Sequence, residues 1–171
     1  MIKVGLGKDM HRLVTGRPFL LGGVDIPFEK GESGHSDGDV LIHAVIDALL
    51  GASGLGDIGE LFPAETVMEQ QSNGISEIVP KWKDADSRVL LSIAWKMIQK
   101  QGWRIVNLDC VVSCENPKIL PYREKIRESL AQVLSVNFET IFIKGKTGEG
   151  LGHVGKGEAV EALAVCLLER D

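Results

Sequence analysis

The pattern of apolar and polar positions predicts strands and helices that alternate along the chain. Strands are predicted at residues 2–6, 105–113 and 140–144, a hairpin at residues 19–27 with its turn at Gly22-Gly23, and helices at residues 39–50, 87–101 and 122–134. For the second helix, Asp86-Ser87 provides the N-cap, apolar residues recur at helical spacing from Val89 to Ile98, and Gly102 ends it. No repeat or shift in composition marks a second domain, so we expect one domain over residues 1–171.

Two segments lack a consistent periodicity. Residues 158–168 are rich in helix-forming residues, which predicts a helix by intrinsic propensity, and their apolar alternation is poor. Residues 64–83 show no clear period at all. A stretch this long within a compact domain is a mobile lid or disordered, and we expect a long flexible loop there.

Composition narrows the class of protein. The chain of 171 residues carries a formal net charge of −5 and no basic tract, which argues against a nucleic-acid partner. Its apolar stretches are broken well short of membrane length and no signal segment precedes them, so we expect a cytoplasmic protein with no membrane partner. The 3 cysteines lack zinc-finger or redox spacing, which fits a reducing compartment, and we interpret Cys110 and Cys114 as small buried residues.

Asp9, His11 and His43 are the candidate metal ligands. Side chains two residues apart in a strand project from the same face, so Asp9 and His11 can approach one ion, and His43 can complete the set from the following helix. Zinc with three protein ligands keeps a fourth position open, which is the catalytic rather than the structural pattern. The alternative is a surface aspartate beside a packed histidine, because Asp-x-His triplets also occur by chance.

The start of that helix is typical of an anion site. Ser36 or Asp37 can serve as the N-cap, and Asp39 lies in the first turn. Backbone N–H groups at such a helix start favour a phosphate or another anion. Asp47 shares a helical face with His43 and is either a partner of that ligand or a buried hydrogen-bonding group.

Two further segments carry chemical groups. Residues 145–157 are rich in glycine and follow a predicted strand, so their N–H groups can face a phosphate, with Lys146, Thr147 and Lys156 supplying charge and hydroxyl contacts. A flexible turn is the alternative, and the segment is not a Walker loop because no helix follows at the required spacing. Residues 114–121 can present backbone groups to a planar ring, or lead into a helix with proline in its first turn.

Together these segments closely resemble the 2-C-methyl-D-erythritol 2,4-cyclodiphosphate synthase family of the non-mevalonate isoprenoid pathway. The resemblance covers nearly the whole chain, and the series of motifs is far more specific than any one of them. The motifs, in family order, are Gly7-Lys8-Asp9-Met10-His11, Gly34-His35-Ser36-Asp37-Gly38-Asp39-Val40 with His43-Ala44, Leu55-Gly56-Asp57-Ile58-Gly59, Phe62-Pro63, Ala85-Asp86-Ser87-Arg88, Pro117-Lys118 and residues 147–157.

The resemblance implies an intramolecular phosphoryl transfer. In this family the 2-phosphate of 4-diphosphocytidyl-2-C-methyl-D-erythritol 2-phosphate attacks the β-phosphorus of the same molecule, which gives the cyclodiphosphate and CMP without a covalent enzyme intermediate. Such a reaction needs positioning and charge neutralisation more than a protein nucleophile. The resemblance implies one Zn²⁺ per active site on Asp9, His11 and His43, and a second divalent cation, Mg²⁺ or Mn²⁺, with Glu149 as its ligand.

The resemblance also implies roles for further residues. His35 and Thr147 match positions that stabilise the transition state. Asp57-Ile58-Gly59 would hold the methylerythritol portion. The backbone of Cys114, Glu115, Asn116, Pro117, Lys118, Ile119 and Leu120 would enclose cytosine, and the other substrate-binding residues are Ser36, Phe62, Lys146, Gly148, His153 and Lys156.

The fold implied by the resemblance is an α+β single-domain two-layer sandwich, with a mixed four-stranded sheet and a small hairpin. The assembly implied is a homotrimer with its sheets around a threefold axis, active sites between adjacent subunits, and an isoprenoid diphosphate as a ligand on the axis. A strand is then expected at residues 158–168, because burial at a trimer core can override helix propensity.

The chain departs from the family pattern at three places. Ala64-Glu65-Thr66 stands where the family has Asp-Thr-Asp, His153 replaces a phenylalanine and Lys156 replaces an arginine. The first departure alters the loop near the substrate, and the other two alter the cavity on the axis.

Two other classes of protein fit the residues. A zinc hydrolase of a phosphoester or amide could use the same three ligands with a general base near the metal-bound water, and a trimeric binding protein would hold cytidine diphosphate or isoprenoids without turnover.

Overall fold

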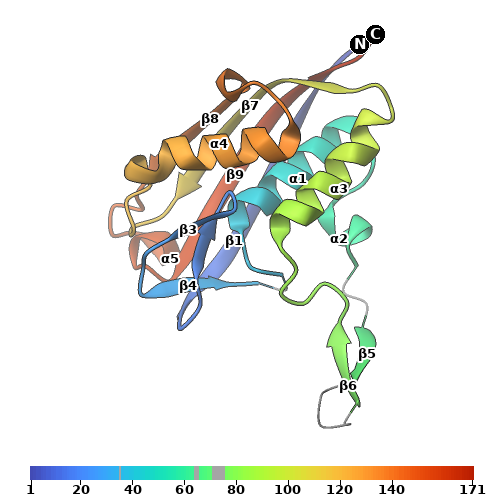
Figure 1. Ribbon diagram of the computed structural model, residues 1–171. Helices are drawn as coiled ribbons and strands as arrows, with labels where there is room; N and C mark the ends of the chain where they lie inside the picture. Colours follow the sequence, from blue (N-terminus) through green and yellow to red (C-terminus); the bar gives the residue numbers. More distant parts are fainter. Residues whose placement is uncertain (35, 64–65, 71–75) are drawn as a thin grey trace.

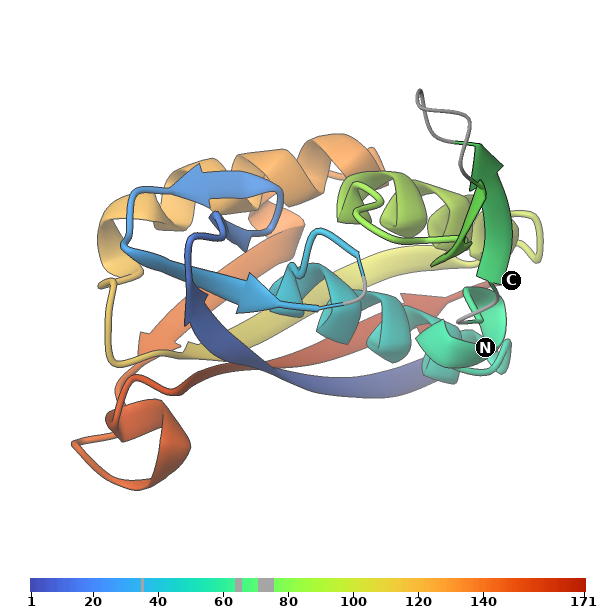
Figure 2. The same ribbon diagram turned by 90° about the horizontal axis from the view of Figure 1, so that it is seen from below.

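The computed structural model describes residues 1–34, 36–63, 66–70 and 76–171, and it shows a sheet with helices over one of its faces (Figure 1, Figure 2). The sheet has five strands, β1 (Ile2–Thr15), β4 (Lys30–Ser33), β7 (Arg104–Ser113), β8 (Ile141–Lys146) and β9 (Ala159–Glu169), in the order β4-β1-β9-β7-β8. β7 and β8 are parallel and the other neighbours are antiparallel. The α+β fold with a mixed sheet is confirmed. The predicted strand number of four is wrong, because β4, which lacks apolar alternation, pairs with the far end of β1.

Three helices form the second layer: α1 (Val40–Ser53), α3 (Ser87–Gln99) and α4 (Arg123–Leu134). α1 lies on β1 and β9 with α3 packed against it, and α4 lies over β8. α1 is apolar on nearly every side because it is buried between the sheet and α3. Its ends are fixed by Asp39 at the N-cap and by Gly54, which adopts a left-handed conformation at the C-cap. These are the three helices predicted from the sequence.

Smaller elements occupy the connections. β2 (Phe19–Leu21) and β3 (Val24–Ile26) form the predicted hairpin. β5 (Thr66–Gln70) and β6 (Ser76–Pro80) pair as an antiparallel ribbon that projects from the body of the molecule, so a ribbon replaces the predicted loop over these two strands (Figure 1). The helices α2 (Ile58–Leu61) and α5 (Gly152–Gly155) and the 3₁₀ turns Leu120–Tyr122 and Phe138–Thr140 are also present. No helix in the described part of the chain is long and apolar enough to cross a membrane.

β9 explains why helix propensity fails for residues 158–168. The strand pairs with β1 on one side and β7 on the other, so the sheet uses its backbone groups along both edges. Ala162, Ala164 and Cys166 are buried, and the Cys166 thiol donates to the carbonyl oxygen of Ala48 on α1 at 3.2 Å. The helix predicted from propensity is wrong, and the strand implied by the resemblance is confirmed, because pairing and burial outweigh a small intrinsic preference.

The opposite face of the sheet is uncovered in the single chain and carries exposed apolar side chains, with the ion pair of Asp109 and Lys144 among them. Val4, Leu6, Phe142 and Val165 are 67%, 65%, 42% and 40% exposed. They lie side by side, because Leu6 pairs with Val165 and Asp109 pairs with both Val165 and Phe142. Exposed apolar side chains gathered on one sheet face form a candidate surface for association.

Candidate metal centre

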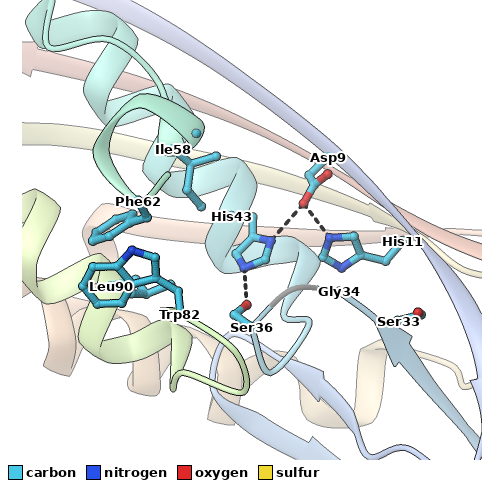
Figure 3. A pocket seen from close by; sticks show the side chains of 11 residues that line it. Asp9, His11, Ser33, Gly34, Ser36, His43, Ile58, Phe62, Trp82 and Leu90 are labelled. Carbon is cyan, nitrogen blue, oxygen red and sulfur yellow. Dashed lines mark hydrogen bonds and ion pairs between the residues drawn. The ribbon is translucent and has the colours of Figure 1, made fainter. Parts of the chain in front are cut away.

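Asp9, His11 and His43 converge on one point of the structure (Figure 3). Oδ2 of Asp9 lies 2.9 Å from Nε2 of His11 and 3.0 Å from Nδ1 of His43. The ligand atoms that the three residues offer all lie within 4.8 Å of one another. Two imidazole nitrogens and one carboxylate oxygen form a donor set that suits zinc with one position left open. The predicted convergence is therefore confirmed, and the group could hold a metal ion.

The side chains converge because β1 lies directly against α1. Asp9 and His11 both project toward the helix, since residues two apart share one face of a strand. His43 stands in the first turn of α1, where the N-cap Asp39 accepts a hydrogen bond from the N–H of Ile42 at 3.0 Å. The same carboxylate accepts two N–H groups from the turn between β2 and β3, which fixes the start of the helix and with it the position of His43.

The outer nitrogen of His11 is held by two acceptors. Nδ1 lies 2.6 Å from the carbonyl oxygen of Gly38 and 3.2 Å from Oε2 of Glu32. A carbonyl and a carboxylate accept hydrogen bonds, so Nδ1 carries the proton. Nε2 of His11 is then the nitrogen available to a metal ion.

The outer nitrogen of His43 is held by hydroxyl groups. Nε2 lies 2.8 Å from Oγ of Ser36 and 3.2 Å from Oγ of Ser87. Ser87 donates its own proton to the carboxylate of Asp37, so its oxygen is free to accept from the imidazole. Nδ1 of His43 is therefore the ligand atom that faces Asp9.

Burial and close charges shift the titration of this centre. Burial alone would raise the pKa of Asp9, but hydrogen bonds from His11 and His43 lower it far below its usual value. Burial alone would lower the pKa of His11, but the hydrogen bonds with Asp9 and Glu32 raise it to about 10. Burial also raises the pKa of Glu32 to about 8. A proton on His11 compensates the carboxylates, and a bound cation would replace it.

A cavity of about 480 Å³ opens beside the three ligands (Figure 3). Its lining is polar at the ligands and Ser36, and apolar where α2, α3 and the segment before α3 contribute side chains. The lining residues besides the three ligands are Ser33, Gly34, Ser36, Ile58, Gly59, Phe62, Trp82 and Leu90. Phe62 and Trp82 pack edge to face with their ring centroids 5.2 Å apart, and together they form a firm apolar wall. The cavity can take a small molecule with an anionic end and a carbon skeleton.

α2 brings part of the predicted substrate-binding set to this cavity. Asp47 of α1 accepts a hydrogen bond from the N–H of Ile58 at 2.8 Å, and Asp57 accepts one from the N–H of Glu60 at 2.9 Å as the N-cap of α2. Asp47 is thus a hydrogen-bonding group that holds α2 in place, rather than a partner of the ligand His43. Ile58 and Gly59 line the cavity as a result.

Other predicted residues gather at the ends of β7 and β8, in residues 114–120 and 146–149, which we call the second cluster. The N–H of Cys114 donates to the carbonyl oxygen of Lys146 at 2.8 Å, and the N–H of Gly148 donates to Oε2 of Glu115 at 3.1 Å. These bonds hold the two segments of the second cluster together. None of these residues lines the cavity beside the metal ligands of the same chain.

The remaining predicted residues lie apart from both groups or outside the described chain. His153 stands in α5 and Lys156 at its C-cap, and the exposed imidazole of His153 lies 2.8 Å from Oε2 of Glu158. His35 lies outside the described residues. Sequence reasoning missed Glu32 and Trp82, because neither segment has a period that predicts which way a side chain points.

The model of the YgbB family matches residues 2–169 of the chain. The 2-C-methyl-D-erythritol 2,4-cyclodiphosphate synthase of Treponema denticola is 55% identical over 167 residues, which cover 98% of this chain and 96% of that relative. The enzyme of the same name from Neisseria gonorrhoeae is 48% identical over 169 residues, which cover 99% of this chain and 98% of that relative. The similarity therefore extends over nearly the full length of both relatives.

Two solved structures share the fold. IspF of Plasmodium falciparum in a CDP complex superimposes with a TM-score of 0.82 at 33% identity, covering 99% of this chain and 97% of that chain. The bifunctional IspDF of Campylobacter jejuni gives a TM-score of 0.88 at 35% identity and covers 100% of this chain, which spans 43% of that longer protein. The Plasmodium structure shows that a protein with this fold binds a cytidine nucleotide.

Proposed function

This chain belongs to the YgbB family, and we propose that it converts 4-diphosphocytidyl-2-C-methyl-D-erythritol 2-phosphate into 2-C-methyl-D-erythritol 2,4-cyclodiphosphate and CMP. Its relatives are lyases of isoprenoid biosynthesis that carry the name of this reaction. The observation that carries the proposal is the convergence of Asp9, His11 and His43 at one cavity, within a chain that matches these synthases over its whole length.

Zinc is the ion we propose for Asp9, His11 and His43. Both histidines are oriented by hydrogen bonds on their outer nitrogens, which is the usual arrangement of imidazoles that bind zinc. The three protein ligands leave one position for a phosphate oxygen. When bound there, zinc supplies a Lewis acid that polarises the β-phosphoryl group.

The methylerythritol portion of the substrate is proposed to lie in the cavity between the metal ligands and α2. Ile58, Gly59 and Phe62 offer an apolar wall to the carbon skeleton, and Ser36 offers a hydroxyl at the polar end. The exposed carboxylate of Asp57, at the start of α2, is positioned to accept a hydrogen bond from a substrate hydroxyl. These contacts hold the 2-phosphate near the β-phosphorus, which is the main requirement of an intramolecular transfer.

The cytidine portion is proposed to bind the second cluster of a neighbouring subunit. The backbone of Cys114 to Leu120 would enclose cytosine, while Lys146, Thr147 and Gly148 contact phosphate. Thr147 and Glu149 already lie together, with Oγ1 of Thr147 donating to Oε1 of Glu149 at 2.5 Å. Glu149 is our proposed ligand for the second cation, Mg²⁺ or Mn²⁺, and Thr147 with His35 would stabilise the transition state.

A homotrimer brings these two halves of the site together. The apolar face that includes Leu6, Phe142 and Val165 supports the proposal, because it is the surface that assembly around a threefold axis would bury. α5 and Lys156 would then lie near the axis, where His153 and Lys156 could bind the diphosphate of an isoprenoid. The cytidine nucleotide substrate and a second copy of the chain are thus the proposed partners.

Phosphorus NMR of the purified protein with the cytidyl substrate tests this function. We expect the diphosphate signals to be replaced by those of the cyclodiphosphate and CMP, in a reaction that stops when a chelator removes the metals. The His43→Ala variant is expected to be inactive, while Glu139→Ala, a change at an exposed side chain far from the metal ligands in sequence, serves as the matched control. Release of inorganic phosphate instead of CMP would identify a hydrolase and contradict the proposal.

Mixed trimers test the placement of the two half-sites. His11→Ala disables the metal centre and Thr147→Ala disables the second cluster, so each variant alone is expected to be inactive. Refolding the two together is expected to restore part of the turnover, because some sites then combine intact halves from different subunits. Mixed trimers of confirmed composition that stay inactive would place both halves of each site in one chain.

A further inference from the structure

Glu32 is a fully buried carboxylate that points at a metal ligand. It lies on β4 opposite Leu13 of β1, two residues beyond His11. Directly paired residues of antiparallel strands project to the same face, so Glu32 shares the helix-facing side of the sheet with His11. Its relative exposure is 0%.

The hydrogen bonds of Glu32 are unequal between its two oxygens. Oε2 accepts from the N–H of Val40 at 2.8 Å and lies 3.2 Å from Nδ1 of His11. Oε1 is buried with no hydrogen-bond partner among the described residues. A buried carboxylate with an unpaired oxygen lowers the stability of the fold, so its contact with His11 needs a functional explanation.

Starting α1 does not require this carboxylate. The helix has its own N-cap in Asp39, which accepts from the N–H of Ile42. The N–H of Val40 needs only a neutral acceptor, such as an amide oxygen. The negative charge of Glu32 is therefore directed at His11, which is the cationic group that contacts it in the described structure.

The two histidines of the metal centre differ in the groups that contact their outer nitrogens. His43 has two neutral hydroxyls at its outer nitrogen, whereas His11 has a carbonyl oxygen and a carboxylate. Zinc brings two positive charges and Asp9 neutralises one of them. Zinc bound at the centre would favour the ionised form of Glu32, and this carboxylate would offset the remaining positive charge through the imidazole of His11.

We propose that Glu32 is a positioning residue of the metal centre, which makes the imidazole of His11 a stronger zinc ligand by accepting a charge-assisted hydrogen bond from Nδ1–H. This proposal rests on the assignment of zinc to Asp9, His11 and His43. A carboxylate in this place also fixes the ring orientation and the tautomer in which Nε2 is free to bind.

Zinc affinity and the stability of the metal-free protein together test the role of Glu32. Glu32→Gln keeps the shape of the side chain and an oxygen for the N–H of Val40 but removes the charge. We expect the zinc dissociation constant, measured by chelator competition, to rise about tenfold. The melting temperature of the metal-free protein checks that Glu32→Gln stays folded, because the variant also removes the carboxylate that faces the protonated His11.

Two further variants separate the contact between Glu32 and His11 from the general effect of removing a buried charge. Asp39→Asn also removes a buried carboxylate at the start of α1, but this carboxylate accepts only backbone N–H groups and does not contact His11. This variant measures the effect of the helix start on His43, and its zinc affinity is expected to fall less than that of Glu32→Gln. Glu32→Asp keeps the charge and withdraws it from Nδ1, so its zinc affinity is expected to fall between those of the wild type and Glu32→Gln.

Equal zinc affinity of the wild type and Glu32→Gln would overturn the proposal while leaving the metal centre in place. Equal weakening by Asp39→Asn and Glu32→Gln would overturn it as well, because the effect would then come from the helix start. A wild-type protein that binds no zinc would overturn both this proposal and the assignment of the ligands.

Discussion

A Cβ atom built on Gly7 would lie 1.9 Å from the carbonyl oxygen of Ala44, so β1 passes α1 at a distance that only glycine permits. The next residue of the same strand face is Asp9, and the neighbour of Ala44 in the helix is His43. The contact between strand and helix backbones therefore sets the distance between two metal ligands. The absence of a side chain at Gly7 thereby contributes to the geometry of the metal centre.

Gly7→Ala is expected to push β1 away from α1. The carbonyl oxygen of Ala44 belongs to the backbone and cannot turn aside, so we expect a loss of about 2 kcal/mol in the free energy of unfolding, as for other overpacked cores. Zinc affinity is expected to fall as well, because Asp9 moves relative to His43. Gly51→Ala is the matched control: a Cβ there meets no atom within 4 Å, and alanine in place of glycine stabilises a helix by about 1 kcal/mol. Equal stability of the two variants would contradict this account of the close contact.

Zinc affinity is expected to rise with pH. His11, with its pKa raised to about 10, carries a proton on the nitrogen that must bind the ion, so zinc competes with that proton throughout the neutral range. The apparent dissociation constant, measured by chelator competition at pH 6, 7 and 8, should fall at each step. An unchanged constant between pH 6 and pH 8 would show that His11 is already neutral in the metal-free protein.

Asp39 is expected to make the fold less stable as pH rises from about 4 to about 6. Burial raises its pKa from 3.8 to about 6, so between these values the folded protein holds a proton that the unfolded chain has released. Stability is fully present below the lower value and is lost as pH passes the upper one. In Asp39→Asn this loss is absent, so the melting temperature of the variant relative to the wild type should rise from pH 4 to pH 7. A constant difference across that range would contradict the shift.

The sequence predicts the helices and the convergence of Asp9, His11 and His43 well, because both depend on local patterns. Capping residues and apolar spacing define α1 and α3, and the Asp-x-His spacing places Asp9 and His11 on one strand face. The apolar pattern does not predict strands that lack this alternation. β4 has no apolar alternation and exists because it pairs with β1, a relationship that no local rule contains.

The helix prediction for β9 is wrong for a different reason. Its residues alternate between small side chains under α1 and apolar side chains such as Val165 on the uncovered face, so both faces of the strand read as apolar and the period of two disappears. The position of Glu32 beside His11 also cannot be predicted from local sequence, because it depends on the pairing of Glu32 with Leu13 across the sheet. Contacts between distant segments decide these positions, and the resemblance to a family supplied the strand where propensity failed.

The zinc content of purified wild-type and His43→Ala protein tests the central claim most directly. If Asp9, His11 and His43 hold the ion, mass spectrometry of the metals should find one zinc per subunit in the wild type and far less in the variant, which retains two ligands. Circular dichroism of both proteins checks that the variant is folded. Full zinc occupancy in a folded His43→Ala protein would contradict the assignment.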